Sequence, residues 1–178
     1  LDHPTLRINI HIDRDTCTVS LDSPGDSLHK RGYREHTNVA PINEVLAAGL
    51  LLMSGWDGLS HFHDPMCGSG TILIEAAMIA CNIPPNINRP EFAFEKWKDW
   101  DVDLFEKIEE SSLNKIRGFD YTITGSDASQ SVMLMAQENI ENANLAEFIK
   151  LKRQDFFKSE KQVDGHLHMV FNPPYGER

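Results

Sequence analysis

The chain has 178 residues, of which 40% are hydrophobic, and its formal net charge is −10. This length fits one domain, or one domain with part of another. No apolar run approaches the roughly 18 residues that span a bilayer, so we expect a cytoplasmic protein with no membrane partner. The three cysteines stand far apart, which indicates neither a disulfide framework nor a zinc site, and we expect no metal.

The negative charge bears on any nucleic-acid substrate. A domain that grips nucleic acid by itself usually presents a basic face. We expect no such face in this chain apart from segment 29–34, which reads HKRGYR. If the substrate is a nucleic acid, we therefore expect most phosphate contacts to come from other parts of the protein.

Two segments near the start alternate apolar and polar residues. They cover residues 6–12 and 17–21, and a polar stretch joins them. This period of two predicts a β-hairpin with one face buried. Because two strands alone are not a stable unit, we expect the hairpin to belong to a domain upstream of Leu1.

A helix is predicted next, with Thr37 or Asn38 as its cap and Pro41 in its first turn. It continues to about Gly55. Helical spacing predicts that one apolar face of this helix belongs to the core. That face comprises Val45, Leu46, Ala48, Gly49, Leu52 and Met53.

The stretch from His63 to Thr71 (HDPMCGSGT) is the most informative part of the first half. A short apolar run leads into Asp64, two glycines give a tight turn, and an apolar helix is expected over residues 71–82. Such a strand–loop–helix unit leaves backbone N–H groups and a helix N-terminus free for a ligand. Glu75, inside the apolar helix, is interpreted as a paired structural acid.

Three kinds of ligand loop compete for this stretch. A P-loop needs a lysine after its last glycine, but Gly70 is followed by Thr71. A dinucleotide loop needs a third glycine, where this chain has Leu73. Asp64 would repel a phosphate and attract a cation, such as the amino group of S-adenosylmethionine (SAM). Taken alone, the loop leaves SAM and an ordinary strand–helix turn equally open.

Three further β-prone runs each lead to a polar residue. Runs 122–127, 148–151 and 167–171 lead to Asp127, Asp155 and Asn172 respectively. A helix is expected over 129–142. Because ligands bind at the carboxyl ends of strands in an open α/β sheet, this repetition favours a nucleotide-like cofactor. An acid at the end of the second strand can accept hydrogen bonds from both ribose hydroxyls.

An insertion separates the strand that leads to Asp64 from run 122–127. Residues 88–100 hold four aromatic side chains among charged ones, and residues 102–117 predict an amphipathic surface helix. The aromatic segment could face RNA and stack on bases. The alternative, which we prefer, is a loop that its aromatic side chains pin to the core.

The tetrapeptide Asn172-Pro173-Pro174-Tyr175 predicts a methyl-transfer site. An exocyclic amine is a poor nucleophile because its lone pair is delocalised. Two acceptors, the Asn172 side-chain oxygen and the Pro173 carbonyl, favour a tetrahedral nitrogen whose lone pair points outward. The prolines stiffen the loop and Tyr175 can stack on a planar target, so a methyl group could transfer in line from a sulfonium.

Together these motifs resemble a known family. Segments 64–77, 92–97 and 172–178 are similar to the THUMP-associated class I SAM-dependent RNA methyltransferases. The resemblance is strongest to the bacterial RlmL type, which methylates N2 of a guanine in 23S rRNA. Segment 29–34 also resembles the junction between the THUMP side and the methyltransferase domain of that family.

The resemblance implies a Rossmann-like class I sheet with SAM as cofactor. The residues implied to bind SAM are Asp64, Pro65, Cys67, Gly68, Ser69 and Gly70 at the methionine part, Asp127 at the ribose, and Asp155 and Phe156 at the adenine. The residues implied to hold the target amine are Asn172, Pro173, Pro174 and Tyr175.

The resemblance also implies a division of the chain. Residues 1–30 would be a hairpin and linker, the tail of a THUMP-containing region. Residues 31–178 would be the N-terminal portion of the methyltransferase domain, with about four of its parallel strands. RNA, 23S rRNA above all, would then be bound mainly by parts outside this chain. Adenine-N6 or protein-glutamine methylation, and a non-catalytic SAM- or RNA-binding module, stay open as alternatives.

Overall fold

A computed structural model of the chain describes residues 6–34, 41–161 and 163–174. It begins with an antiparallel hairpin of β1 (Ile8–Asp13) and β2 (Thr16–Leu21). The elements that follow are α1 (Glu44–Met53), β3 (His61–Asp64), α2 (Thr71–Cys81), the 3-10 turn η1 (Ala93–Lys96), α3 (Val102–Leu113), β4 (Ile123–Asp127), α4 (Gln130–Asn142), β5 (Ile149–Arg153), the 3-10 turn η2 (Phe156–Lys158) and β6 (Leu167–Met169).

The second sheet is parallel, with strand order β5-β4-β3-β6. The chain runs outward from β3 through β4 to β5, and then returns to place β6 on the other side of β3. This reversal makes the carboxyl end of β3 a topological switch point, where open α/β sheets bind ligands. The predicted α/β sheet and its four parallel strands are confirmed.

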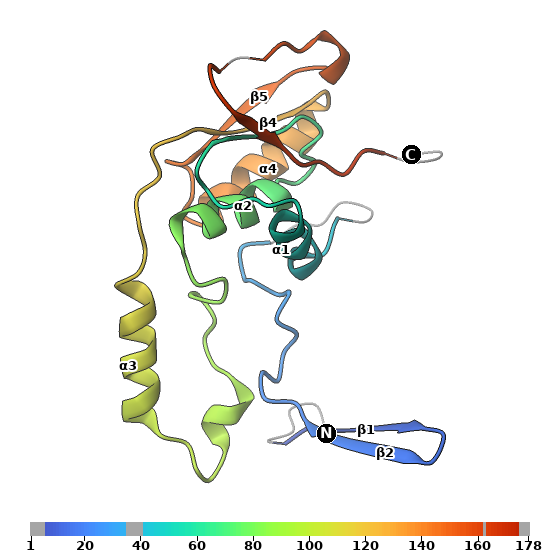
Figure 1. Cartoon of the computed structure of the whole chain (residues 1–178), viewed down its shortest axis with the longest axis vertical. Helices are drawn as coiled ribbons and strands as arrows, with labels where there is room; N and C mark the ends of the chain where they lie inside the picture. Colours follow the sequence, from blue (N-terminus) through green and yellow to red (C-terminus); the bar gives the residue numbers. More distant parts are fainter. Residues whose placement is uncertain (1–5, 35–40, 162, 175–178) are drawn as a thin grey trace.

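Helices pack against one face of this sheet (Figure 1). On that face Phe62, Ile123 and Ile149 stand side by side in register, and each is at most 5% exposed. A Cβ atom at Gly125 would collide with the Leu73 side chain of α2, so α2 lies very close to β4. The core of the chain is therefore the layer between these strands and helices α1, α2 and α4.

The opposite face carries polar side chains. His63 Nδ1 lies 2.8 Å from Thr124 Oγ1, and Thr124 stands opposite Lys150 in the neighbouring strand. No helix of the described residues covers this face, and it borders a cavity of about 860 Å³. None of residues 64–70 lines that cavity, but Phe156, one of the residues implied to bind SAM, does.

Helix α2 confirms the prediction of a buried apolar helix. All its residues except Ile79 are buried. The indole of Trp56 donates to the Ala76 carbonyl at 3.0 Å, which ties the turn before β3 to the middle of α2. Packing on all sides makes α2 a rigid support for the loop that precedes it.

Helix α1 corrects two predictions. Its cap is Asn43, whose side chain accepts from the Leu46 N–H at 3.2 Å, so Pro41 precedes the helix. Thr37 and Asn38 lie outside the described residues. The predicted core face is wrong, since Met53, for example, is 87% exposed. The residues that do pack inward are Glu44, Ala47 and Leu51.

The hairpin forms where it was predicted, but the expectation of a buried face is not met in the described residues. Every residue of β1 and β2 is exposed. Three apolar residues of β1 nevertheless stand opposite three of β2. The pairs are Ile8 with Leu21, Ile10 with Val19, and Ile12 with Cys17.

The insertion between α2 and β4 extends away from the sheet (Figure 1). Phe92, Phe94, Trp100 and Phe105 pack ring against ring, with centroids 4.9–6.2 Å apart. The Phe94 N–H donates to the Ser23 carbonyl at 3.0 Å. The aromatics thus pin the insertion to itself and to the segment after β2, and not to the main core as we had preferred.

Candidate cofactor site at the carboxyl ends of the strands

The loop after β3 has the geometry of a ligand cradle. Gly68 and Gly70 adopt positive φ of 53° and 84°, a region that glycine occupies without strain. Gly70 is the N-cap of α2, and no side chain caps this helix. The first N–H groups of α2 are therefore available to an acceptor on a ligand.

Asp64 lies at the base of this loop. Only 1% of the residue is exposed. Its Oδ1 accepts from the Met66 N–H at 3.1 Å, while its Oδ2 is buried without a partner. Burial raises the pKa of Asp64 to about 7, and the nearby Asp127 carboxylate acts in the same direction. An orphaned buried carboxylate oxygen costs free energy, and a cationic donor would remove that cost.

Asp127 joins the end of β4 to the loop. Its Oδ2 accepts from the Gly68 N–H at 3.3 Å, and its Oδ1 accepts from the Ser129 N–H at 2.9 Å. The Cys67 N–H donates to the Ser126 carbonyl at 2.9 Å, and Ser126 Oγ donates to the Pro65 carbonyl at 3.3 Å. The structure therefore brings Asp64, the loop and Asp127 together as the sequence predicts.

The residues after β5 and β6 reach the same edge of the sheet. Asp155 follows β5, accepts from the Phe157 N–H at 3.0 Å, and has a side chain 45% exposed. The Phe156 ring lies 6.0 Å from the ring of Phe171, centroid to centroid. This contact places Asp155 and Phe156 beside the segment that carries Asn172, Pro173 and Pro174. Tyr175 lies outside the described residues.

The chain is similar to known proteins of one family. A family model described as "RMKL-like, methyltransferase domain" matches residues 31–178. The chain belongs to this family. It is 38% identical over 185 residues to Ribosomal RNA large subunit methyltransferase K/L of Marinomonas sp. (strain MWYL1), a match that covers 99% of this chain and 26% of that protein. The chain thus spans about a quarter of the length of this relative.

Solved structures agree with this placement. A possible methylase from Clostridium difficile 630 is 42% identical with a TM-score of 0.89. The SMU.472 protein, solved in complex with S-adenosyl-L-homocysteine (SAH), is 37% identical with a TM-score of 0.88. Each match covers 97% of this chain and 45% of the solved chain. The predicted Rossmann-like methyltransferase fold is confirmed.

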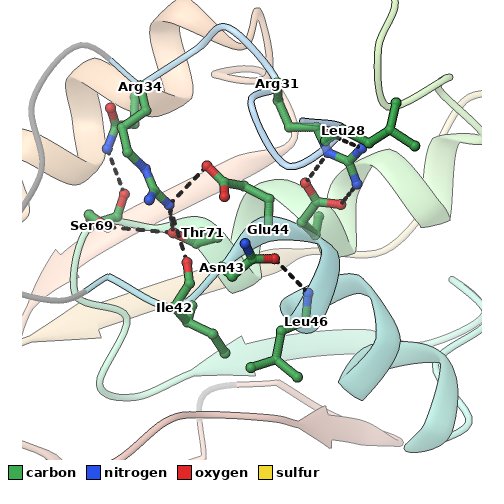
Figure 2. Close-up of polar contacts among 11 residues, drawn as sticks. Leu28, Arg31, Arg34, Ile42, Asn43, Glu44, Leu46, Ser69 and Thr71 are labelled. Atoms are coloured by element: carbon green, nitrogen blue, oxygen red, sulfur yellow. Dashed lines mark hydrogen bonds and ion pairs between the residues drawn. The ribbon is translucent and has the colours of Figure 1, made fainter. Parts of the chain in front are cut away.

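The RMKL-like domain contains polar contacts at the loop that our sequence reasoning missed. The Asn139 side chain of α4 donates to the Ser69 carbonyl at 2.9 Å. Arg34 donates to Thr71 Oγ1 at 2.6 Å, while Arg31 pairs with Glu75 (Figure 2). The basic cluster of segment 29–34 was the signal for the arginines, and the place of Glu75 in an apolar helix was the signal for that acid. Nothing local marked Ser69 and Thr71 as partners.

Cys67, the cysteine of the loop, is buried. Burial raises the pKa of the Cys67 thiol, so this residue is a poor nucleophile. Within residues 6–34, 41–161 and 163–174, no cluster of His, Cys, Asp and Glu is arranged to hold a metal ion. Nor does any helix in these ranges have the length and apolarity of a membrane span.

Proposed function

We propose that this chain is the cofactor-binding part of a SAM-dependent RNA methyltransferase that acts on the exocyclic N2 amine of a guanine in 23S rRNA. The observation that carries the proposal is the buried, unpartnered Oδ2 of Asp64 beneath an uncapped helix N-terminus. This combination offers one acceptor to an ammonium group and several donors to a carboxylate. The methionine part of SAM carries both groups.

The remaining residues fit the rest of the cofactor. Asp127 stands at the end of the second strand, where its carboxylate can accept from the ribose hydroxyls. Asp155 is exposed at the end of the third strand and can accept from the adenine amino group, with the Phe156 backbone at the ring. When bound, SAM supplies an electrophilic methyl group on a sulfonium. The SMU.472 protein, with its bound SAH, supports this choice of ligand.

Asn172 and Pro173 would hold the target amine. They follow β6, which pairs with β3, so they leave the sheet at the same edge as Asp64. Two acceptors there would orient the amine, with Pro174 stiffening the loop and Tyr175 stacking on the base. Proximity and orientation would then supply most of the rate enhancement.

The RNA substrate is inferred from the relatives and from charge. The Marinomonas relative is named for methylation of large-subunit ribosomal RNA. The net charge of −10 and the inward orientation of Arg31 and Arg34 leave this chain poorly suited to grip RNA alone. We propose that residues 1–30 are the tail of a THUMP-containing region and that other parts of a cytoplasmic protein bind the RNA.

Mass spectrometry of nucleosides tests this function. Ribosomal RNA from a deletion strain is expected to lack one N2-methylguanine in the large subunit. The full-length gene should restore this nucleoside, whereas an Asn172→Ala variant should restore it at a rate lower by about 10²-fold, as for a lost transition-state contact.

The outcomes separate the candidate reactions. Loss of N6-methyladenine with N2-methylguanine intact would replace guanine by adenine as the target. Unchanged rRNA nucleosides together with a lost methylglutamine would point to a protein substrate. Full restoration by the Asn172→Ala gene would remove Asn172 from the mechanism.

A further inference from the structure

The segment between the hairpin and α1 turns two arginines inward, while its Lys30 is exposed. Arg31 is 9% exposed, and its Nε lies 3.2 Å from Glu75 Oε1. Arg34 Nη2 lies 3.3 Å from Glu44 Oε1, and both of these side chains are largely buried. The segment therefore makes two buried ion pairs with the domain, one to α2 and one to α1 (Figure 2).

These two ion pairs differ in what else they hold. Arg31 contacts Glu75 in the second turn of α2 and the Leu28 carbonyl, and its hydrogen bonds among the described residues do not reach the loop 65–70. Arg34 Nη2 also donates to Thr71 Oγ1, at 2.6 Å. Thr71 is the first residue of α2 and directly follows Gly70. Arg34 thus reaches the cofactor loop and Arg31 does not.

The Arg34–Glu44 pair is poorly explained by stability alone. Arg34 Nε and Glu44 Oε2 are buried without partners. A buried ion pair with unsatisfied atoms pays a desolvation penalty that its attraction does not fully return. The short bond from a guanidinium to a hydroxyl, in contrast, is directional and holds Thr71 in one orientation.

The loop needs such restraint. Two glycines with positive φ have large conformational freedom in an unrestrained chain, and no side chain caps α2. Asn139 of α4 holds the Ser69 carbonyl, and Arg34 holds the side chain of Thr71, two residues further along the chain. A loop that is already ordered loses less entropy when a ligand binds, so it binds that ligand more tightly.

We propose that Arg34 is a positioning residue, which presets the cofactor loop through Thr71 and thereby raises the affinity for SAM. The proposal rests on the function proposed above and deepens it. Arg34 itself touches neither cofactor nor substrate in this account. It also means that segment 31–34, through which the hairpin joins the methyltransferase domain, is coupled to the cofactor site.

Calorimetric titration of the full-length protein with SAM tests the proposal. Thr71→Val keeps the shape of the side chain but removes the acceptor, and we expect its Kd to rise about tenfold, which corresponds to the entropy of ordering about one loop residue on binding. Thr71→Ser keeps the hydroxyl, and its Kd should return to within about threefold of the wild-type value.

A matched pair of arginine variants separates positioning from folding. Arg31→Met and Arg34→Met each leave a buried glutamate unpaired, so both should lower the melting temperature without SAM. Only Arg34→Met should weaken SAM binding at temperatures where both variants are folded. In the Arg34→Met background, adding Thr71→Val should change the Kd little further, because the bond is already lost.

Each outcome has a distinct meaning. Equal SAM affinity in the wild type and Thr71→Val, equal losses in the two arginine variants, or additive losses in the double variant would each overturn the positioning role and leave the proposed function standing. A wild-type protein that does not bind SAM would overturn the proposed function and this inference together.

Discussion

Two buried acids, Asp64 at the end of β3 and Glu75 in α2, differ in their hydrogen-bond partners. Glu75 accepts from both Nε and Nη2 of Arg31, which confirms the expectation of a paired structural acid. Asp64 is buried as deeply, yet one of its oxygens has no partner. For Asp64, which lies beneath the loop, we propose that a ligand supplies the missing partner.

At the residue scale, SAM binding should depend on pH through Asp64. Its pKa in the free protein is about 7, so the carboxyl is largely protonated below that pH. An ammonium ligand requires the carboxylate, so binding releases a proton. Affinity should therefore rise from about pH 5.5 to about pH 7.5, by up to about tenfold per pH unit below the pKa. Calorimetry across this range provides the measurement.

An Asp64→Asn variant serves as the control for this titration. The amide cannot ionise, so its SAM affinity should be lower and nearly constant over the same range. The ammonium of SAM is mostly protonated over this range, which leaves Asp64 as the main source of the slope. A wild-type protein with no pH dependence would contradict a contact between Asp64 and the ammonium.

At the scale of elements, the apolar helices α1 and α2 behave differently. Helix α2 is apolar all round and buried all round, so its pattern predicted its surroundings correctly. Helix α1 is also apolar on most sides, and more than one stripe could have packed inward. Contact with α2 selected Ala47 and Leu51, and left Leu52 63% exposed. Periodicity identifies a helix but does not rank two equivalent apolar faces.

The contact between α2 and β4 yields a stability prediction. Gly125→Ala should destabilise the protein by about 1–3 kcal/mol, because the new Cβ would overlap Leu73 and press on Leu151 in a filled core. Gly118→Ala is the matched control, since nothing lies within 4 Å of its Cβ and its φ is not positive. Urea unfolding measures both variants. Equal free energies of unfolding would show that α2 can shift away from β4.

At the scale of the whole molecule, the net charge of −10 and the exposed surfaces bear on RNA binding. Arg31 and Arg34 of the basic segment pair internally with Glu75 and Glu44. Exposed basic side chains occur instead at Lys30 and on β5, at Lys150, Lys152 and Arg153. The hairpin exposes its apolar residues, and the far side of the parallel sheet is not covered by any helix of the described residues. Arg31 and Arg34 therefore do not form a cationic surface near the cofactor loop that could bind a polyanion.

We therefore expect the 178-residue chain to bind 23S rRNA fragments more weakly than the full-length protein. The slope of log K against log salt should also be smaller in magnitude, by roughly 0.7–0.9 for each phosphate contact that the rest of the protein makes. Fluorescence anisotropy at several salt concentrations measures both quantities, with circular dichroism as the control for folding. Equal slopes for the two proteins would place the RNA contacts within residues 1–178.

Local periodicity and turn chemistry were enough to predict the order of the strands and helices along the chain. They also predicted the loop between Asp64 and Thr71 and the acids at the strand ends. Only the tertiary structure decided that β6 pairs with β3. It also turned Arg31 and Arg34 inward and left Asp64 Oδ2 unpartnered. Most of these outcomes depend on partners far away along the chain, such as Thr71 for Arg34, 37 positions away, and Leu167 for His61, 106 positions away. A local pattern carries no information about such pairings.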